Sequence, residues 1–287
     1  MNQEFIDLYE GYRKGVMDRR DFFTKLARLA GGTAAAAALL PLLEGRTAWA
    51  QVIPADDARL QTGYIEYPIE GGKMRAYSAR PKGEGKHPGV IVIHENRGLN
   101  PHTEDVARRV ALEGYHAIAP DALSPVGGTP SNPDEIRPLF QKLDAKANAR
   151  NFAAAVQYLK TNPQTTGKVG CVGFCWGGGV TNQVAVLSPD LTAAVPFYGS
   201  QPAVEDVPKI KAAMLIHYAG QDERINAGIP AFEEALKKAG IEYQIFMYEG
   251  AQHAFFNDTN PARHNKEASQ LAWQRTIEFF KAKLKTG

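Results

Sequence analysis

Residues 169–179 have the sequence Val-Gly-Cys-Val-Gly-Phe-Cys-Trp-Gly-Gly-Gly. The first six form a short apolar run typical of a buried strand, and a helical pattern begins at Trp176. Cys175 lies between the two, with Gly173 and Gly177 two residues away on either side. This is the strand–turn–helix pattern G-x-nucleophile-x-G, with cysteine where serine usually stands. Its glycines are needed because the turn leaves no room for a Cβ, so the pattern predicts a nucleophilic thiol on a strained backbone.

The turn also places the thiol at a helix N-terminus. The positive end of a helix stabilises a thiolate, and the backbone N–H of Trp176 is expected to point toward a developing oxyanion. A glycine-rich phosphate loop is the alternative interpretation of residues 173–179. It is disfavoured because neither a G-K-[ST] ending nor G-x-G-x-x-G spacing is present.

The chain has two cysteines, Cys171 and Cys175. Cys175 occupies the turn, whereas Cys171 lies in the apolar run and is predicted to be a buried structural residue. Residues four apart in a strand are separated by roughly 13 Å, at about 3.3 Å per residue, which is more than a disulfide can span. Both are therefore predicted to be free thiols.

Other short apolar runs recur along the chain and predict strands covered on both faces. Helical patterns separate them, and this alternation is typical of an α/β fold with a mostly parallel sheet and helices on both faces. Residues 64–69 and 74–80 instead alternate apolar and polar around Gly71-Gly72, which predicts an N-terminal antiparallel hairpin. Sites in such sheets lie at the carboxyl ends of the strands. The predicted strands are 89–93, 116–119, 169–174, 193–198, 213–218 and 243–248, and the predicted helices are 103–113, 134–160, 176–187, 230–239 and 266–284.

A base for the thiol is expected among the histidines. It should follow a late strand and lie beyond the acid, because enzymes with this turn have the order nucleophile, acid, histidine. His253 follows the run 243–248 and fits this place. His217 lies inside a strand pattern and is predicted to be a hydrogen-bonded core residue. Solvated or packing roles are predicted for His87, His102, His116 and His264.

The acid that orients this base is expected at a neighbouring strand end. Asp222 comes soon after the run 213–218, and a carboxylate there would fix the imidazole tautomer and stabilise the imidazolium. Glu223 and Glu249 are nearby alternatives, which sequence spacing alone does not exclude.

An early strand is followed by Ile-His-Glu-Asn-Arg-Gly-Leu at residues 93–99. The loop in this place normally supplies a second oxyanion donor, and the N–H of Asn96 is positioned for it. Glu95 is less expected there. A solvated surface charge is the ordinary role of an exposed glutamate, so both a structural and a functional role stay open on the residues alone.

Taken together, these residues resemble the dienelactone hydrolase (carboxymethylenebutenolidase-like) family of the α/β-hydrolase superfamily. The resemblance covers about residues 60–285 and rests on Gly-Phe-Cys-Trp-Gly-Gly-Gly at 173–179, Gly-Gln-Asp at 220–222, His-Ala-Phe at 253–255 and His-Glu-Asn-Arg-Gly at 94–98. It implies an α/β-hydrolase fold and a Cys-His-Asp triad that cleaves an ester or lactone through an acyl-cysteine. It also implies that Glu95 hydrogen-bonds the resting thiol and takes part in generating the thiolate.

Two other functions remain compatible with these motifs. A thioester or peptide-type hydrolase would use the same triad, and a catalytically silent α/β-hydrolase would act as a binding protein. The intact triad disfavours the silent protein.

The chain departs from the family at the substrate side. Members of the chlorocatechol pathway grip a substrate carboxylate with arginines, one of them four residues after the histidine, where this chain has Asn257. Residues 123–132 lack the other arginine. Arg97 and Arg224 are candidates to contact substrate, as is Asn257. Since a buried carboxylate without a charged partner is costly, uncharged or weakly anionic esters and lactones are the predicted substrates.

Residues 1–50 resemble a twin-arginine export signal. Arg19-Arg20 precedes a weakly apolar run at 26–43, and Ala48-Trp49-Ala50 offers a small-x-small cleavage site. We expect cleavage after Ala50, a periplasmic or otherwise exported enzyme, and a single catalytic domain over residues 51–287. 

An amphipathic helix packed on the catalytic domain is the alternative interpretation of residues 1–50. A membrane-spanning helix is disfavoured because Lys25 and Arg28 interrupt the apolar run.

Charge and composition limit the possible partners. The 33 basic and 31 acidic residues are spread along the chain and give a net charge of +2, so neither nucleic acid nor a membrane surface after processing is an expected partner. The expected partner is a small-molecule ester or lactone. No cofactor is expected, and no metal site is predicted because the sequence has no H-E-x-x-H motif and no Cys/His cluster. The oligomeric state is left open.

Overall fold

A computed structural model describes residues 4, 8, 12, 17–33, 35–36 and 52–285. The chain divides into two compact units, Met1–Val52 and Ile53–Gly287.

The first unit contains helix α2 (Arg19–Ala30). Asp18 caps its N-terminus by accepting a hydrogen bond from the N–H of Asp21 at 2.8 Å, and Gly31 ends it in the left-handed conformation. Both arginines that open the helix are exposed. The expected cleavage site after Ala50 lies outside the described residues, and among those described no helix is long and apolar enough to cross a membrane.

The second unit contains an eight-stranded sheet in the order β1-β2-β4-β3-β5-β6-β7-β8. β2 pairs antiparallel with β1 and with β4, and the remaining neighbours pair parallel, so the predicted hairpin and mostly parallel sheet are confirmed. The strands are β1 (Leu60–Ile69), β2 (Gly72–Pro81), β3 (His87–Ile93), β4 (His116–Pro120), β5 (Thr165–Phe174), β6 (Ala193–Phe197), β7 (Ala213–Gln221) and β8 (Tyr243–Gln252).

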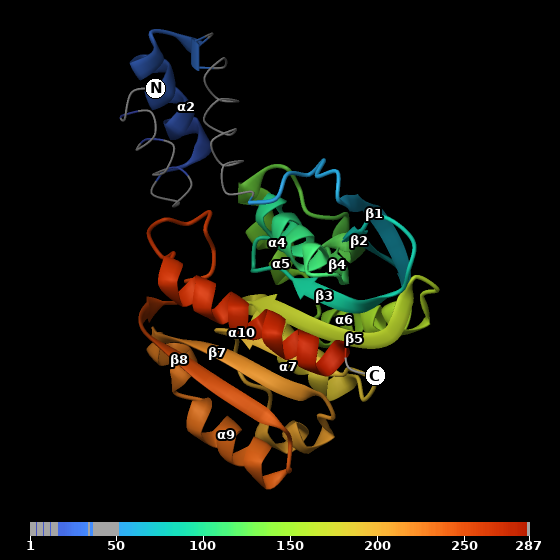
Figure 1. The fold of residues 1–287 in the computed structure, drawn as a ribbon. Helices are drawn as coiled ribbons and strands as arrows, with labels where there is room; N and C mark the ends of the chain where they lie inside the picture. Colours follow the sequence, from blue (N-terminus) through green and yellow to red (C-terminus); the bar gives the residue numbers. More distant parts are fainter. Residues whose placement is uncertain are drawn as a thin grey trace. The chain divides into compact units, whose positions relative to one another are not determined.

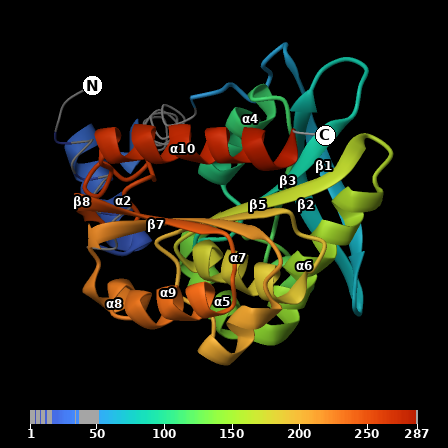
Figure 2. The same cartoon turned by 60° about the horizontal axis from the view of Figure 1, so that its bottom comes forward.

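Helices cover both faces of this sheet, as Figures 1 and 2 show, with α4 and α10 on one side and α6, α7 and α9 on the other. Successive residues of β3 alternate between the two cores: Val92 packs with the α4 and α10 side, and Ile91 with the α6, α7 and α9 side. The inner strands β3, β4 and β6 are almost wholly buried, which explains why their sequences lack polar alternation, whereas the edge strands β1 and β8 are partly exposed. The helices are α4 (Pro101–Leu112), α5 (Ile136–Gln141), α6 (Ala145–Thr161), α7 (Trp176–Leu187), α8 (Glu223–Asn226), α9 (Ile229–Lys238) and α10 (Lys266–Leu284), with 3-10 turns η2 (Ser124–Val126), η3 (Pro133–Glu135) and η4 (Val204–Lys209).

The prediction of one helix over residues 134–160 was wrong. The region consists of η3, α5 and α6, with a break between α5 and α6. Asp144 starts α6 by accepting a hydrogen bond from the N–H of Ala147 at 2.6 Å. Pro138 would interrupt the interior of a long helix, but in the first turn of α5 its missing N–H costs nothing.

The register of the parallel strands brings their carboxyl ends to one edge of the sheet. Gly173 of β5 pairs with Ile93 of β3 and with Pro196 of β6, and Gln221 of β7 pairs with Gln252 of β8. The loops that follow β3, β5, β7 and β8 therefore leave the sheet at the same edge, with β7 and β8 extending beyond the end of β5, and these loops carry the residues singled out from the sequence.

Candidate active site

The turn after β5 has the strained backbone that its sequence predicts. Cys175 has φ 56° and ψ −115°, a conformation that residues with a side chain rarely adopt. A Cβ on Gly173 would lie 2.2 Å from the carbonyl oxygen of Gly177, and one on Gly177 would lie 2.4 Å from that of His94. The N–H of Cys175 donates to the carbonyl of Phe197 at 3.0 Å, which anchors the turn to β6.

Three side chains form a continuous hydrogen-bonded chain at this edge. His253 Nδ1 lies 2.5 Å from Asp222 Oδ2, and His253 Nε2 lies 2.9 Å from Cys175 Sγ. The carboxylate can only accept, so Nδ1 carries the proton and Nε2 is left to accept from the thiol. Of the carboxylates considered from the sequence, Asp222 makes this bond, and Glu223 and Glu249 are exposed.

Two features hold the imidazole in this position. Asp222 is only 8% exposed, at the end of β7 and the start of α8, and His253 follows β8 directly. The ring of Tyr198 lies against the imidazole, with centroids 5.1 Å apart. Sequence patterns did not single out Tyr198, because an aromatic residue inside a predicted apolar strand is ordinarily part of the core.

The pKa of the Cys175 thiol is raised above its ordinary value in the folded chain. Burial, with the negative charge of Glu95, raises the pKa of Cys175 to about 11, although the N–H of Trp176 and the charge of Arg224 act in the opposite direction. The N–H of Trp176, at the start of α7, acts in the expected direction, toward the thiolate. Desolvation outweighs the helix, so the resting thiol keeps its proton at neutral pH.

Glu95 follows β3 and is half-buried. Its Oε2 accepts a hydrogen bond from Asn257 Nδ2 at 2.8 Å, and its Oε1 is buried without a hydrogen-bond partner. The resemblance implied a hydrogen bond from the resting thiol to this glutamate. In the described site the thiol bonds His253 instead, and Glu95 acts on Cys175 through its charge.

The two expected oxyanion donors lie on opposite sides of the thiol in sequence. Trp176 begins α7 directly after Cys175, and its N–H lies close enough to the sulfur to lower the pKa of the thiol. Asn96 is exposed in the loop after β3. Its N–H donates to no group of the described chain, so it is free to donate a hydrogen bond to an oxygen of a ligand.

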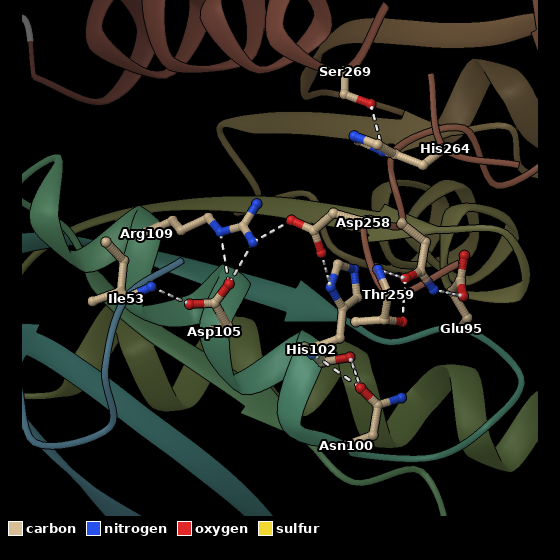
Figure 3. Close-up of polar contacts among 12 residues, drawn as sticks. Ile53, Glu95, Asn100, His102, Asp105, Arg109, Asp258, Thr259, His264 and Ser269 are labelled. Carbon is tan, nitrogen blue, oxygen red and sulfur yellow. Dashed lines mark hydrogen bonds and ion pairs between the residues drawn. The ribbon is translucent and has the colours of Figure 1, made fainter. Parts of the chain in front are cut away.

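The segment after His253 is fastened by a partly buried ion-pair network (Figure 3). Asp258 Oδ1 lies 3.1 Å from His102 Nδ1, Asp258 Oδ2 accepts from Arg109 at 2.5 Å, and Arg109 also pairs with Asp105. Burial alone would raise the pKa of Asp258, but the hydrogen bond from His102 and the charge of Arg109 hold it below its usual value. This network holds Asp258, which is next to Asn257. Asn257 Oδ1 in turn accepts a hydrogen bond from the N–H of Thr259 at 3.0 Å.

The three residues predicted to contact substrate lie in different surroundings. Arg97 is exposed, and the amide of Asn257 is already bound to Glu95 and Thr259. Arg224 is exposed and lines an open pocket of about 380 Å³ beside the imidazole. The pocket also contains Arg263, which sequence reasoning missed because it lies far from any strand end. The residues that line the pocket are Gln221, Asp222, Arg224, Gln252, His253 and Arg263.

The remaining histidines lie outside this chain of bonds. His217 is buried in β7 and hydrogen-bonds Thr276 at 3.1 Å and Tyr248 at 2.9 Å, which confirms the predicted core role. Burial, with the charge of Arg275, lowers the pKa of His217 to about 3. His116 is buried in β4 against Ser78, His264 lies near Ser269 (Figure 3), and His87 begins β3.

Both cysteines are free thiols, as predicted. Cys171 is buried inside β5 and Cys175 is partly buried in the turn. Within the described residues no group of three or more His, Cys, Asp or Glu side chains is arranged to hold a metal ion.

Comparisons with known proteins identify the family and the fold of the chain. A model of the dienelactone hydrolase family matches residues 74–284. A protein of Escherichia coli K12 named "Putative carboxymethylenebutenolidase" is 34% identical over 247 residues, covering 80% of this chain and 90% of that protein. Protein usf from Aquifex pyrophilus is 35% identical over 231 residues, covering 76% and 96%. The dienelactone hydrolase structure from Anabaena variabilis shares the fold, with a TM-score of 0.63 at 23% identity, covering 79% of this chain and 99% of that one.

Proposed function

Because the chain belongs to the dienelactone hydrolase family and is a carboxylic ester hydrolase, we propose that it cleaves its ester or lactone through Cys175, His253 and Asp222. The observation that carries the proposal is the hydrogen-bonded chain from thiol to imidazole to carboxylate. A neutral imidazole that accepts from a protonated thiol is the arrangement required for a general base to activate a nucleophile only when it attacks.

In the first half of the reaction, the sulfur of Cys175 attacks the substrate carbonyl while its proton passes to His253 Nε2. The carbonyl oxygen becomes an oxyanion, which the N–H groups of Asn96 and Trp176 are placed to stabilise. Asp222 stabilises the imidazolium that forms. The tetrahedral intermediate then expels the alkoxide, which takes the proton from His253, and an acyl-cysteine remains.

In the second half, water gives a proton to His253 and adds to the acyl carbonyl. The second tetrahedral intermediate expels the sulfur, which recovers its proton from the imidazolium, and the carboxylic acid is released. With a lactone, the leaving hydroxyl stays attached to the acyl group, so one ring-opened product results.

The test is a comparison of substrate classes on the full chain. We expect turnover of p-nitrophenyl acetate and a neutral lactone, and loss of both activities in the Cys175→Ala variant. A much higher kcat/KM for an acyl thioester or a peptide would favour the thioester or peptide-type hydrolase. Binding of these ligands without turnover of any of them would identify a binding protein.

We further propose that the preferred substrates are uncharged or weakly anionic. Asn257 stands where the family's carboxylate-binding arginine would stand, and its amide is held by Glu95, which is itself acidic. A neutral ester should therefore exceed its carboxylate analogue by about tenfold in kcat/KM, or roughly 1.4 kcal/mol. Preference for the anionic ester, lost in Arg224→Ala or Arg97→Ala, would reject this specificity and identify the arginine responsible.

We also propose that residues 1–50 are a twin-arginine export signal, that the mature enzyme of residues 51–287 is periplasmic, and that it has no stable membrane association. The paired arginines at the exposed start of α2 support this. Replacing Arg19 and Arg20 with lysine should retain the precursor in the cytoplasm. Mature protein beginning at Gln51 in the periplasm of that variant would reject the assignment.

A further inference from the structure

His94 is a buried histidine beside the triad that the mechanism above does not use. It follows β3 directly, in the loop that carries Glu95 and Asn96, and it is only 1% exposed. Its Nε2 lies 3.1 Å from the backbone N of Ala122, and its Nδ1 lies 2.5 Å from the carbonyl oxygen of Glu95.

These two contacts determine the tautomer of the ring. The N–H of Ala122 can only donate, so Nε2 must accept, and a neutral imidazole then carries its proton on Nδ1. Nδ1–H consequently donates to the Glu95 carbonyl. Burial lowers the pKa of His94, in keeping with a ring that stays neutral.

The carbonyl held by His94 belongs to the same peptide group as the Asn96 N–H. A peptide group is planar and trans, so a hydrogen bond that holds its C=O also determines the direction of its N–H. The N–H of Asn96 has no hydrogen-bond acceptor within the described chain, whereas the carbonyl of the same peptide group is held by His94. The orientation of one oxyanion donor therefore depends on Nδ1 of His94.

His94 also touches the residue that supplies the other donor. Its ring stacks on that of Trp176, with centroids 5.4 Å apart and planes at 13°. The rings of Phe140 and Phe152 pack edge-on around this stack. The backbone of His94 lies so close to the start of α7 that a Cβ on Gly177 would come within 2.4 Å of its carbonyl oxygen.

We propose that His94 is a positioning residue that holds the Asn96 and Trp176 N–H groups at the spacing required by the oxyanion. This role rests on the proposed function, because it concerns the oxyanion of the same reaction. It predicts that His94 affects the acyl-transfer step, in which an oxyanion forms, and leaves the intrinsic reactivity of the thiol unaffected.

Two substitutions separate the two nitrogens of the ring. In His94→Asn the side-chain amide can take the place of Nδ1–H and donate to the Glu95 carbonyl. In His94→Gln the amide oxygen can take the place of Nε2 and accept from Ala122, but the donor to Glu95 is lost. Both remove the aromatic stack on Trp176, so the pair isolates the bond to the peptide group.

On the full chain, we expect His94→Gln to lower kcat for p-nitrophenyl acetate about 100-fold with KM changed less than about threefold, in line with the loss of an oxyanion donor. His94→Asn should retain kcat within about tenfold of the unsubstituted protein. Alkylation of Cys175 by iodoacetamide forms no oxyanion, so its rate should change less than about threefold in both variants. His217→Gln, which alters an equally buried histidine outside the site, is the control for lost stability and should leave kcat unchanged.

Equal losses of kcat in the Asn and Gln variants would overturn the proposal, as would alkylation that falls in parallel with kcat. If His217→Gln loses as much kcat as His94→Gln does, the loss in His94→Gln comes from lower stability and the proposal is overturned. An unsubstituted protein that alkylates at Cys175 but hydrolyses no ester would contradict the proposed function itself, and the role of His94 with it.

Discussion

The two cysteines of this chain lie four residues apart on either side of the end of β5. Cys171 is fully buried within the strand, and its Sγ lies 3.7 Å from the hydroxyl of Thr181. Cys175 lies one residue past the strand with a positive φ, and its Sγ lies 2.9 Å from an imidazole. Burial raises the pKa of both, to about 12 for Cys171 and about 11 for Cys175.

The difference between the two thiols is thus not acidity at rest. Neither is a thiolate at neutral pH. The groups around each thiol, and not the residue type, determine which one can react. The turn after β5 presents Cys175 to a base that is held by a carboxylate, whereas Cys171 faces a hydroxyl that cannot take up its proton.

Removing each sulfur in turn should have the largest effect. Cys175→Ala should lower turnover by at least about 1,000-fold while circular dichroism stays unchanged, because no other group can form the acyl intermediate. Cys171→Ala should leave kcat within about threefold and lower stability by about 1 kcal/mol through a small cavity. Equal losses of turnover in the two variants would show that the nucleophile is misassigned.

The turn itself can be tested by adding one methyl group. In Gly177→Ala the new Cβ would meet the carbonyl oxygens of His94 and Ile93 at 2.4 and 2.5 Å, so the turn must shift. We expect a loss of about 1–3 kcal/mol in stability and about 100-fold in kcat, since displacing a nucleophile by about 1 Å is enough for the latter. Gly63→Ala, which meets no atom within 4 Å, is the control. Unchanged kcat in Gly177→Ala would show that Cys175 tolerates a different turn.

The pH dependence of alkylation tests the state of the resting thiol. A pKa of about 11 means that Cys175 is protonated below that pH and that the thiolate fraction rises about tenfold per pH unit as the pH increases toward it. Iodoacetamide should therefore label Cys175 about 100-fold faster at pH 9 than at pH 7, and Cys171 should stay unlabelled in the folded protein. A plateau below pH 8 would mean that a thiolate is preformed.

The smallest expected effect is that of Glu95. Its negative charge contributes to the raised pKa of Cys175, so Glu95→Gln should lower that pKa. The rate of labelling by iodoacetamide at pH 8 should then increase a few-fold, as expected when one charge near a partly buried group is removed. The pH profile of kcat/KM should shift to lower pH in the same direction. Slower labelling would mean that Glu95 assists thiolate formation, as the family resemblance implies.

The sheet, its hairpin and the positions of the site residues at strand ends could be predicted from the sequence because they depend on local patterns. Apolar runs of strand length and the glycines around Cys175 are constraints that a single segment imposes on itself. The same reasoning failed over residues 134–160, where the capping by Asp144 competed with a continuous helical pattern.

What could not be predicted depends on contacts between distant segments. The hydrogen bond from Asn257 to Glu95 joins residues 162 positions apart. It engages the carboxylate for which the resemblance implied a hydrogen bond with the resting thiol. The high pKa of Cys175 follows from burial in the assembled site, which opposes the helix N-terminus visible in the sequence. The tautomer of His94 depends on Ala122, which no motif links to it.

Capture of the acyl group tests the assignment of the nucleophile most directly. Rapid acid quenching during turnover of p-nitrophenyl acetate, followed by peptide mass spectrometry, should find an added acetyl group on Cys175, and Asp222→Asn should change the amount of adduct but not its position. Acetylation of Cys171 or of another residue, or turnover by the Cys175→Ala variant at an undiminished rate, would contradict the assignment of Cys175 as the nucleophile.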